Sequence, residues 1–361
     1  MKNILYMIHT AGDGGSEEYV YKLIKNIDRN KFKAYLAYSK DGKLVEKLKN
    51  EGIEVFKIDM KSIIDIKSIF DIINIVKKYN IDIIHTQFAR ENYLSVIAKL
   101  FCSRIKVIYT NHIILNEGKL KKILNKFISK KNDAIIAVSE ASKNKMISQN
   151  ICNSKIQIIY NGVKIPKIIN NDIRISIRKK YDISENEFVF INISRFSEEK
   201  GILELLDSIK LLNNLNINQK FKLFLVGDGY LSNEIKLKID ELLLDNVILT
   251  GYKNNTIDYL LASDLYINSS KNENLSFSII EALSVGLPII ATNVGGNSEI
   301  ISKESNVGIL CEFDTVSMKD AMLKILNDRN LYINFKKNTI DYVKNKFDED
   351  KMLEKTYELY K

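Results

Sequence analysis

Short runs of β-branched and aromatic residues alternate with amphipathic segments along almost the whole chain. The short runs have the length and composition of buried strands, and apolar residues recur at helical spacing in the segments between them. This alternation is typical of parallel sheets built from βαβ units. In the first half we predict strands at residues 3–9, 32–39, 55–59, 81–87, 106–112, 133–139 and 156–160. In the second half we predict strands at residues 188–194, 221–226, 247–250, 264–269, 288–292 and 308–312.

The restart of this rhythm predicts an α/β protein with two Rossmann-like domains, each a doubly wound parallel sheet. A chain of 361 residues also exceeds what one hydrophobic core usually serves. We expect an N-terminal domain at 1–165, a C-terminal domain at 166–345, and a terminal helix at 346–361 that packs back towards the N-terminal domain. Ligands of such sheets bind outside the carboxyl ends of the strands. His9, His85 and His112 follow or end predicted strands of the first domain and are expected to line the cleft.

The composition, with 45% hydrophobic and 27% charged residues, is that of a folded globular protein. Cys102, Cys152 and Cys311 are far apart and lack C-x2-C spacing, so neither a disulfide framework nor a zinc site is predicted. Unpaired cysteines of this kind are consistent with a protein of the reducing cytoplasm. No stretch reaches the roughly 18 apolar residues that cross a bilayer. The net charge of +9 is consistent with binding to nucleic acid or to an anionic membrane. It is equally consistent with a Lys- and Asn-rich composition that has no functional meaning.

One segment, residues 119–131, concentrates positive charge in a helical pattern. Six lysines share it with five apolar residues at helical spacing: Leu120, Ile123, Leu124, Phe127 and Ile128. The pattern predicts a basic amphipathic helix. Two interpretations stay open. The helix lies on an anionic membrane surface, or it is a crossover helix on the sheet with a lysine-rich solvent face.

A glycine-rich turn, G-D-G-G-S-E at 12–17, follows the first predicted strand and opens a helix. Glu17 occupies the third glycine position of the dinucleotide-binding fingerprint, and the Gly-Lys-Ser/Thr of a P-loop is absent from this turn. The backbone at Gly15 could still approach an anion at the helix N-terminus. A purely structural turn would use the same residues.

Two cations, Arg195 and Lys200, lie in R-F-S-E-E-K-G after the first strand of the second domain. Cations at the carboxyl end of a strand, just before a helix, suit a diphosphate. The alternative is a pair of solvated loop residues. Gly227–Gly229 (G-D-G) forms a tight turn after the next strand, with its amides near the same edge of the sheet.

The most informative stretch is residues 268–299. A predicted strand ends at Ser269, Glu273 lies in the following loop, and a helix from about 276 to 285 carries Glu281. Gly286 is expected to cap this helix before the strand that begins at Pro288. Both carboxylates can reach a ligand at that end of the sheet. Alternatively, Glu281 serves the helix dipole and Glu273 is a surface acid.

With this stretch, the chain resembles the retaining glycosyltransferases of family 4, which have the GT-B architecture and an E-x7-E signature, here Glu273 and Glu281. The other matching motifs are G-G-S-E at 14–17, T-N-H at 110–112, V-S-E at 138–140, Y-N-G-V at 160–163, R-x4-K-G at 195–201 and V-G-D-G at 226–229. The resemblance covers essentially the whole length. It implies that the second domain binds the donor and the first domain builds the acceptor site.

The resemblance also implies roles for single residues. Glu281 would bind the ribose hydroxyls, Glu273 the donor sugar, and Arg195 with Lys200 the diphosphate, while His112 would lie near the donor sugar and acceptor. Further donor contacts are expected at Gly15, Gly227, Tyr252, Lys253, Asn274, Leu275 and Ser276. Asn274 stands where the family commonly has glycine, and asparagine tolerates left-handed backbone angles better than most residues.

The implied reaction moves a sugar from a nucleoside diphosphate sugar, with a UDP-sugar favoured, to an acceptor hydroxyl with retention. The acceptor would be a glycan or lipid-linked molecule of cell-surface polysaccharide or glycolipid synthesis. We expect no metal or other cofactor, no nucleic acid partner, and a cytoplasmic protein at the inner face of the membrane. The D-x-D string at 348–350 starts the terminal helix and is interpreted as structural. A nucleotide-sugar 2-epimerase and a non-catalytic nucleotide-sugar-binding subunit are the alternatives.

Overall fold

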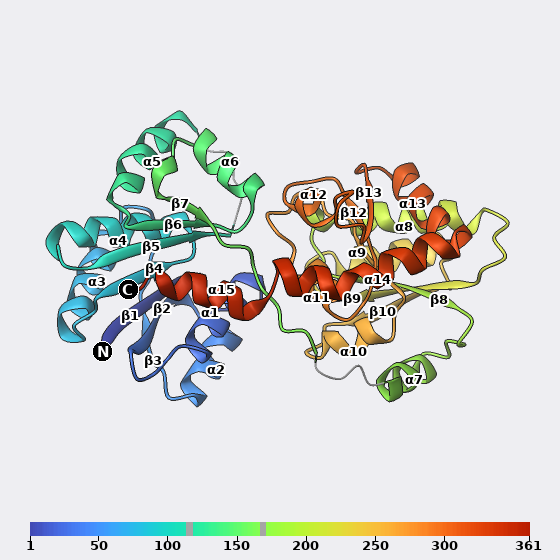
Figure 1. Ribbon diagram of the computed structural model, residues 1–361, viewed down its shortest axis with the longest axis horizontal. Coiled ribbons are helices and arrows are strands. Elements are labelled where there is room, and N and C mark those ends of the chain that lie inside the picture. The colour runs from blue at the N-terminus through green and yellow to red at the C-terminus, as the bar shows by residue number, and fades with distance from the viewer. Residues whose placement is uncertain (113–117, 167–170) are drawn as a thin grey trace. The chain divides into compact units, whose positions relative to one another are not determined.

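The computed structural model describes residues 1–112, 118–166 and 171–361 (Figure 1). The chain divides into two compact units. Unit 1 comprises Met1–Asn161 and Asp350–Lys361, and unit 2 comprises Gly162–Glu349. No helix within the described ranges combines the length and the apolar character needed to span a membrane.

Unit 1 is built on a parallel sheet of seven strands in the order β3-β2-β1-β4-β5-β6-β7. The strands are β1 (Lys2–Thr10), β2 (Phe32–Lys40), β3 (Glu54–Lys57), β4 (Ile83–Thr86), β5 (Lys106–Asn111), β6 (Ala134–Ala137) and β7 (Ile156–Ile158). The helices are α1 (Gly15–Lys25), α2 (Lys43–Asn50), α3 (Ile66–Lys78), α4 (Ala89–Phe101), α5 (Lys119–Lys131), α6 (Glu140–Ser148) and most of α15 (Glu349–Glu358). Alternate residues of the strands pack on α3 and α4 on one face of the sheet.

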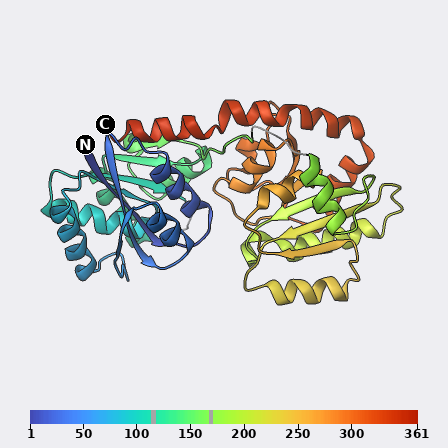
Figure 2. The same ribbon diagram turned by 90° about the horizontal axis from the view of Figure 1, so that it is seen from below.

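The two chain ends lie side by side in unit 1 (Figure 2). Tyr360, the penultimate residue, is fully buried, and its hydroxyl lies 2.6 Å from Nδ1 of His85. Nε2 of His85 lies 2.7 Å from the hydroxyl of Thr110. The expectation that His85 lines a cleft is therefore wrong, because the C-terminus covers it. Burial, followed by the neighbouring His112, lowers the pKa of His85 to about 3.

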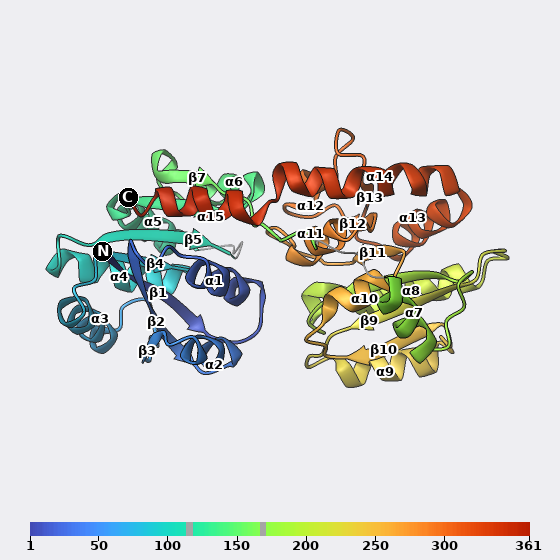
Figure 3. The same cartoon turned by 60° about the horizontal axis from the view of Figure 1, so that its bottom comes forward.

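Unit 2 contains a parallel sheet of six strands in the order β10-β9-β8-β11-β12-β13. The strands are β8 (Phe188–Ile193), β9 (Phe221–Val226), β10 (Val247–Gly251), β11 (Leu265–Asn268), β12 (Ile289–Thr292) and β13 (Gly308–Cys311). The helices are α7 (Asn171–Lys180), α8 (Ile202–Asn213), α9 (Ser232–Glu241), α10 (Thr256–Leu261), α11 (Phe277–Ser284), α12 (Asn297–Ile300), α13 (Thr315–Asn327) and α14 (Arg329–Lys346). The main apolar core lies between the sheet and α8, α9 and α13, whereas α10 packs on the opposite face (Figure 3).

The predicted fold class, two doubly wound parallel sheets, is confirmed. Every predicted strand is present, and its ends lie within two residues of the prediction. In each sheet the chain winds outwards in opposite directions from two central neighbours, β1 and β4 in unit 1 and β8 and β11 in unit 2. The loops after these neighbours diverge at the carboxyl ends of the two strands, where ligands of such folds bind, and we call this point the crevice of each unit.

Candidate functional site

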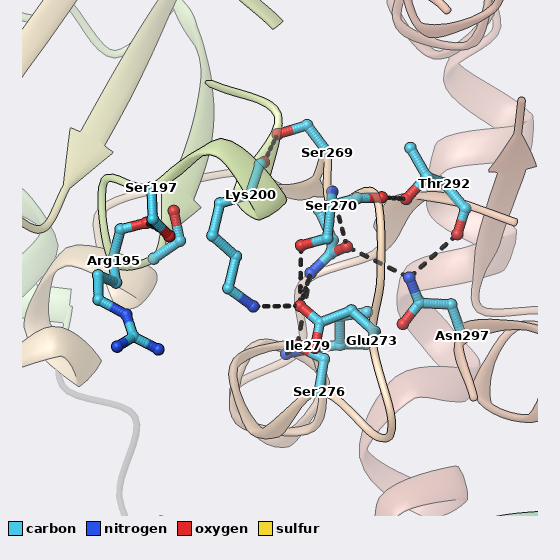
Figure 4. Close-up of polar contacts among 12 residues, drawn as sticks. Arg195, Ser197, Lys200, Ser269, Ser270, Glu273, Ser276, Ile279, Thr292 and Asn297 are labelled. Atoms are coloured by element: carbon cyan, nitrogen blue, oxygen red, sulfur yellow. Dashed lines mark hydrogen bonds and ion pairs between the residues drawn. The ribbon is translucent and has the colours of Figure 1, made fainter. Parts of the chain in front are cut away.

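The crevice of unit 2 gathers the two motifs that the sequence placed 73 positions apart. Arg195 and Lys200 follow β8, and Glu273 follows β11, the strand beside it. Nζ of Lys200 lies 2.6 Å from Oε1 of Glu273 (Figure 4). Their side chains are 20% and 11% exposed, so the ion pair lies mostly shielded from solvent. The structure therefore pairs a residue predicted to bind the diphosphate, Lys200, with the residue predicted to bind the donor sugar, Glu273.

Two further donors orient the Glu273 carboxylate. The Ser270 hydroxyl donates to the same Oε1 at 2.8 Å, and Nδ2 of Asn268 donates at 3.3 Å. Among the described residues, Oε2 of Glu273 has no hydrogen-bond partner. One carboxylate oxygen is thus used for positioning, and the other is available to a ligand.

The loop after β8 packs directly on the loop after β11. Gly201 has a φ of +61°, and a Cβ there would lie 2.1 Å from the carbonyl oxygen of Ser269. The Ser269 hydroxyl donates to the carbonyl of Lys200 at 2.8 Å, and the Lys271 amide donates to the carbonyl of Glu199 at 2.8 Å. Only glycine permits this approach of two backbones, and the approach holds Lys200 beside Glu273.

The loop after β12 supports Glu273 from the other side. Gly295 has a φ of +51°, and a Cβ there would lie 1.6 Å from the carbonyl oxygen of Glu273. Nδ2 of Asn297 donates to Oδ1 of Asn268 at 3.2 Å and to the carbonyl of Thr292 at 3.0 Å. The left-handed backbone at this junction belongs to Gly295. Asn274 has a negative φ, so the left-handed tolerance invoked for it in the sequence is not used.

Helix α11 begins at the same loop. The hydroxyl of Ser276 accepts from the amide of Ile279 at 3.4 Å and caps the helix. The helix ends before Gly286, whose φ of +90° confirms the predicted cap. The side chain of Leu275 is buried, so its contribution to a ligand could come only from its backbone.

Glu281 is half-buried in the second turn of α11. The buried Tyr266 of β11 reports on both predicted carboxylates. Burial raises the pKa of Tyr266, and the charges of Glu273 and Glu281 raise it further. Both carboxylates are therefore near enough to the Tyr266 hydroxyl to act on it electrostatically.

Arg195 is exposed on a loop held from behind by the G-D-G turn. The amide of the buried Phe196 donates to the carbonyl of Asp228 at 2.9 Å. A Cβ on Gly227, whose φ is +150°, would lie 1.9 Å from the carbonyl oxygen of Ser194. The observed role of Gly227 is thus to let the ends of β8 and β9 approach. The Arg195 guanidinium extends to the side on which Lys200 meets Glu273 (Figure 4).

Tyr252 and Lys253 follow β10, at the edge of the same sheet. Tyr252 is 45% exposed, and its hydroxyl donates to Oδ1 of Asn254 at 3.0 Å. Nζ of Lys253 lies 6.0 Å from the ring centroid of Tyr259. These two residues lie at the carboxyl edge of the sheet, two strands away from β8.

The remaining predicted site residues belong to unit 1. Gly15 is the first residue of α1, and Glu17 accepts a hydrogen bond from the Ser16 hydroxyl at 2.7 Å. Nε2 of His112 lies 3.0 Å from Oε1 of Gln87. Burial lowers the pKa of His112 to about 3, so its imidazole is neutral at physiological pH.

Helix α5 confirms the predicted helix at 119–131, but its apolar face does not pack as a single surface. Its fully buried side chains are Asn125 and Ser129. Leu120, Ile123 and Phe127 are 73%, 54% and 63% exposed, and we call them the apolar stripe of α5. The stripe shares the outer face of the helix with lysines. The crossover interpretation is correct for the connection from β5 to β6, but it does not account for the exposed stripe.

Several supporting residues were not assigned from the sequence. Asn268, Ser270, Gly295 and Asn297 all lie inside the stretch 268–299, and each positions Glu273 or its loop. The sequence feature that could have identified them is the clustering of Ser, Gly and Asn residues after two predicted strands. Their roles required the packing of three loops, which a linear pattern does not contain.

Two family models match the chain. Residues 173–342 match the model described as glycosyl transferases group 1, and residues 13–165 match the model described as Glycosyltransferase Family 4. Together they span most of both units.

Individual relatives match over most of their length. The chain is 28% identical to the N-acetyl-alpha-D-glucosaminyl L-malate synthase of Bacillus anthracis, over 79% of this chain and 76% of that protein. It is 28% identical to the UDP-Gal:alpha-D-GlcNAc-diphosphoundecaprenol alpha-1,3-galactosyltransferase of Escherichia coli, over 84% of this chain and 79% of that protein.

Solved structures show the same fold. A glycosyltransferase from Rickettsia africae ESF-5 superposes with a TM-score of 0.86 at 25% identity, covering 99% of this chain and 97% of that chain. Anabaena Alr3699/HepE in complex with UDP-glucose superposes with a TM-score of 0.84 at 20% identity, covering 99% of both chains.

Proposed function

The chain belongs to glycosyltransferase family 4, and on this premise we propose that it transfers a sugar from a nucleoside diphosphate sugar to an acceptor hydroxyl. We propose a UDP-sugar as the donor and retention at the anomeric carbon. The UDP-glucose complex of a protein with the same fold supports this donor class. The Escherichia coli galactosyltransferase and the capsular polysaccharide glycosyltransferase CapH of Staphylococcus aureus support an acceptor in polysaccharide or glycolipid synthesis.

The observation that carries the proposal is the packing of the loops after β8, β11 and β12 around Lys200 and Glu273. When the bond between sugar and phosphate breaks, negative charge grows on the leaving diphosphate. Arg195 and Lys200 are positive groups at the edge where this charge would develop. Removing a single preorganised donor of this kind typically lowers kcat by about 100- to 1,000-fold.

Glu273 is proposed to serve two purposes through its two oxygens. Oε1 fixes the position of Lys200, since a lysine side chain is otherwise flexible. Oε2 would accept a hydrogen bond from a hydroxyl of the donor sugar. Lys200 has three N–H donors, so one can stay on Glu273 while another contacts a phosphate oxygen.

The start of α11 would complete the donor site. Backbone amides at Leu275 and Ser276 precede or cap the helix, and the positive end of its dipole favours an anion. Glu281, one turn further on, would accept hydrogen bonds from the ribose hydroxyls. Tyr252 and Lys253 would meet the base at the carboxyl end of β10. These charges and amides provide for the diphosphate without a metal ion.

The acceptor hydroxyl must lose a proton during transfer. A base with a pKa of about 3, such as His112, takes up a proton poorly at physiological pH. We therefore propose that the leaving phosphate oxygen receives the proton on the same face of the sugar, consistent with retention. His112 and the turn at Gly15 would position the donor sugar and acceptor.

The apolar stripe of α5 favours a membrane surface as a further partner. Apolar side chains on the outside of a lysine-rich helix suit the boundary between headgroups and acyl chains of an anionic bilayer. We accordingly propose a cytoplasmic protein that lies at the inner face of the membrane.

A donor screen tests the proposal. Thermal unfolding with UDP-, GDP-, ADP- and CDP-sugars identifies the donor, and product analysis by NMR then determines the anomeric configuration. Transfer to an added acceptor with retention supports the proposal. Inversion at the anomeric carbon would contradict the proposed stereochemistry. Release of an epimerised free sugar without any acceptor would favour the 2-epimerase alternative, and donor binding without turnover would favour the non-catalytic subunit.

A further inference from the structure

The crevice of unit 1 contains charged residues that the donor chemistry does not use. It lies at the carboxyl ends of β1 and β4, the two central neighbours of the sheet. Arg90 and Glu91 occupy the first turn of α4, directly after β4. His9 lies near the end of β1, and Lys40 ends β2, the strand on the other side of β1. Four charged or titratable groups therefore meet at one edge.

The guanidinium of Arg90 is fixed in orientation but only partly used. Its Nη1 lies 3.1 and 3.2 Å from the two ring nitrogens of His9, and it donates to the carbonyl of Met60 at 3.0 Å. Nearly equal distances to both nitrogens place Nη1 over the ring face, because an in-plane approach would collide with the carbon between them. Among the described residues, Nε and Nη2 of Arg90 have no partner.

His9 does not compete for an anion. Burial, followed by the charges of Arg90 and Lys40, lowers its pKa, so the ring stays neutral under the guanidinium. Asp13, in the turn after β1, is paired with Lys43 at 2.9 Å. Arg90 and Lys40 therefore leave a positive charge at this edge that the described ion pairs do not neutralise.

Glu91, next to Arg90 in the chain, is an acid that is buried at this edge rather than exposed. The side chain is fully buried, and among the described residues neither carboxylate oxygen has a hydrogen-bond partner. Buried polar side chains are nearly always paired, and an unpaired one costs free energy. Burial raises the pKa of Glu91 to about 7, although its own amide, the charge of Arg90 and the amide of His9 act in the opposite direction. The Glu91 carboxyl therefore keeps its proton to a higher pH than an ordinary glutamate and opposes the positive charge of Arg90 less than an exposed carboxylate would.

We propose that the unit 1 crevice binds an acceptor that carries an anionic group, a carboxylate or a phosphate, on the free edge of Arg90. The inference rests on the proposed function, which makes unit 1 the acceptor domain. A guanidinium fork matches the two oxygens of either anion with parallel hydrogen bonds. Lys40 adds long-range attraction, and the rigid contact with His9 removes the entropy cost of ordering Arg90 on binding.

The test uses the full chain in two steps. First, UDP is added to saturation, which fills the phosphate site of unit 2, and the rise in Tm reports donor binding. Second, inorganic phosphate or malonate is titrated at constant ionic strength, with chloride and glycerol as charge and hydroxyl controls. We expect a further rise in Tm with phosphate, malonate or both, and the responding anion identifies the acceptor group. Arg90→Gln should need about tenfold more anion for the same rise.

The controls separate the possible failures. Arg104→Gln removes an exposed arginine of the same unit and should respond like the wild type. Lys40→Gln leaves the contacts of Arg90 intact, so it provides a second weakening variant if Arg90→Gln folds poorly. No response to either anion, or an equal response in the wild type and both crevice variants, would overturn the inference. Absence of the rise in Tm with UDP would count against the proposed function. The rise in Tm with phosphate or malonate, and its dependence on Arg90, would still decide whether the unit 1 crevice binds an anion.

Discussion

Replacing Gly295 with alanine should impair donor chemistry as well as stability. A Cβ at this position would lie 1.6 Å from the carbonyl oxygen of Glu273. The two loops must therefore separate by more than about 1 Å, and a misplacement of that size can cost about 100-fold in rate. The φ of +51° adds a backbone cost of about 1 kcal/mol for any residue with a Cβ.

A second glycine separates these two effects. Gly52 has a φ of +74°, but a Cβ there would meet no atom within 4 Å. Gly52→Ala should therefore lose about 1 kcal/mol of unfolding free energy and keep the wild-type rate. Gly295→Ala should lose at least as much stability and, in addition, about 100-fold in kcat/KM. Urea unfolding and UDP release in the presence of acceptor measure the two quantities. A folded Gly295→Ala protein with the wild-type rate would refute the claim that this packing positions Glu273.

Three other changes test separate parts of the structure. Tyr360→Phe leaves Nδ1 of the buried His85 without a partner and should lower the unfolding free energy of unit 1 by about 1–3 kcal/mol in urea. Tyr230→Phe, in unit 2 with a ring that is 69% exposed, should change the unfolding free energy of unit 1 by less than about 0.5 kcal/mol. Glu91 has a folded pKa of about 7, above its unfolded value, so its protonated form is favoured in the fold and stability is lost as pH rises from 4.5 through 7. Glu91→Gln should accordingly gain stability over the wild type at pH 8 and not at pH 4, and equal unfolding curves at both pH values would contradict this. Serine at all three positions of the apolar stripe of α5 should abolish flotation with anionic liposomes, whereas unchanged flotation would exclude α5 as the membrane contact.

The sheets were predictable because both units use uninterrupted strand–helix alternation with strands buried on both faces. Buried parallel strands appear in the sequence as short apolar runs. The observed ends of β9 therefore coincide with the predicted ends. The pairing of Lys200 with Glu273 follows from strand order. Once β8 and β11 are known to be neighbours, their loops must meet.

Other features depended on contacts that no local pattern contains. His85 was expected at a surface, but Tyr360, 275 positions away, covers it. The left-handed residue beside the Glu273 loop is Gly295 rather than Asn274, because the tight approach is made by the loop after β12. For helix α5, the sequence periodicity predicts an apolar face but cannot predict whether that face points to the sheet or to solvent. In unit 1, the crevice residues Arg90 and Glu91 follow a predicted strand end, yet their importance depends on which atoms remain unpaired.

The cations beside Glu273 are expected to stabilise the leaving diphosphate. The most direct measurement is kcat for transfer from the identified nucleotide sugar by Arg195→Ala and Lys200→Ala, compared with Arg104→Ala as an exposed control. Each site variant should retain its fold and lose about 100- to 1,000-fold in kcat, with the control unchanged. Folded site variants that transfer sugar as fast as the wild type would show that these cations do not stabilise the leaving diphosphate.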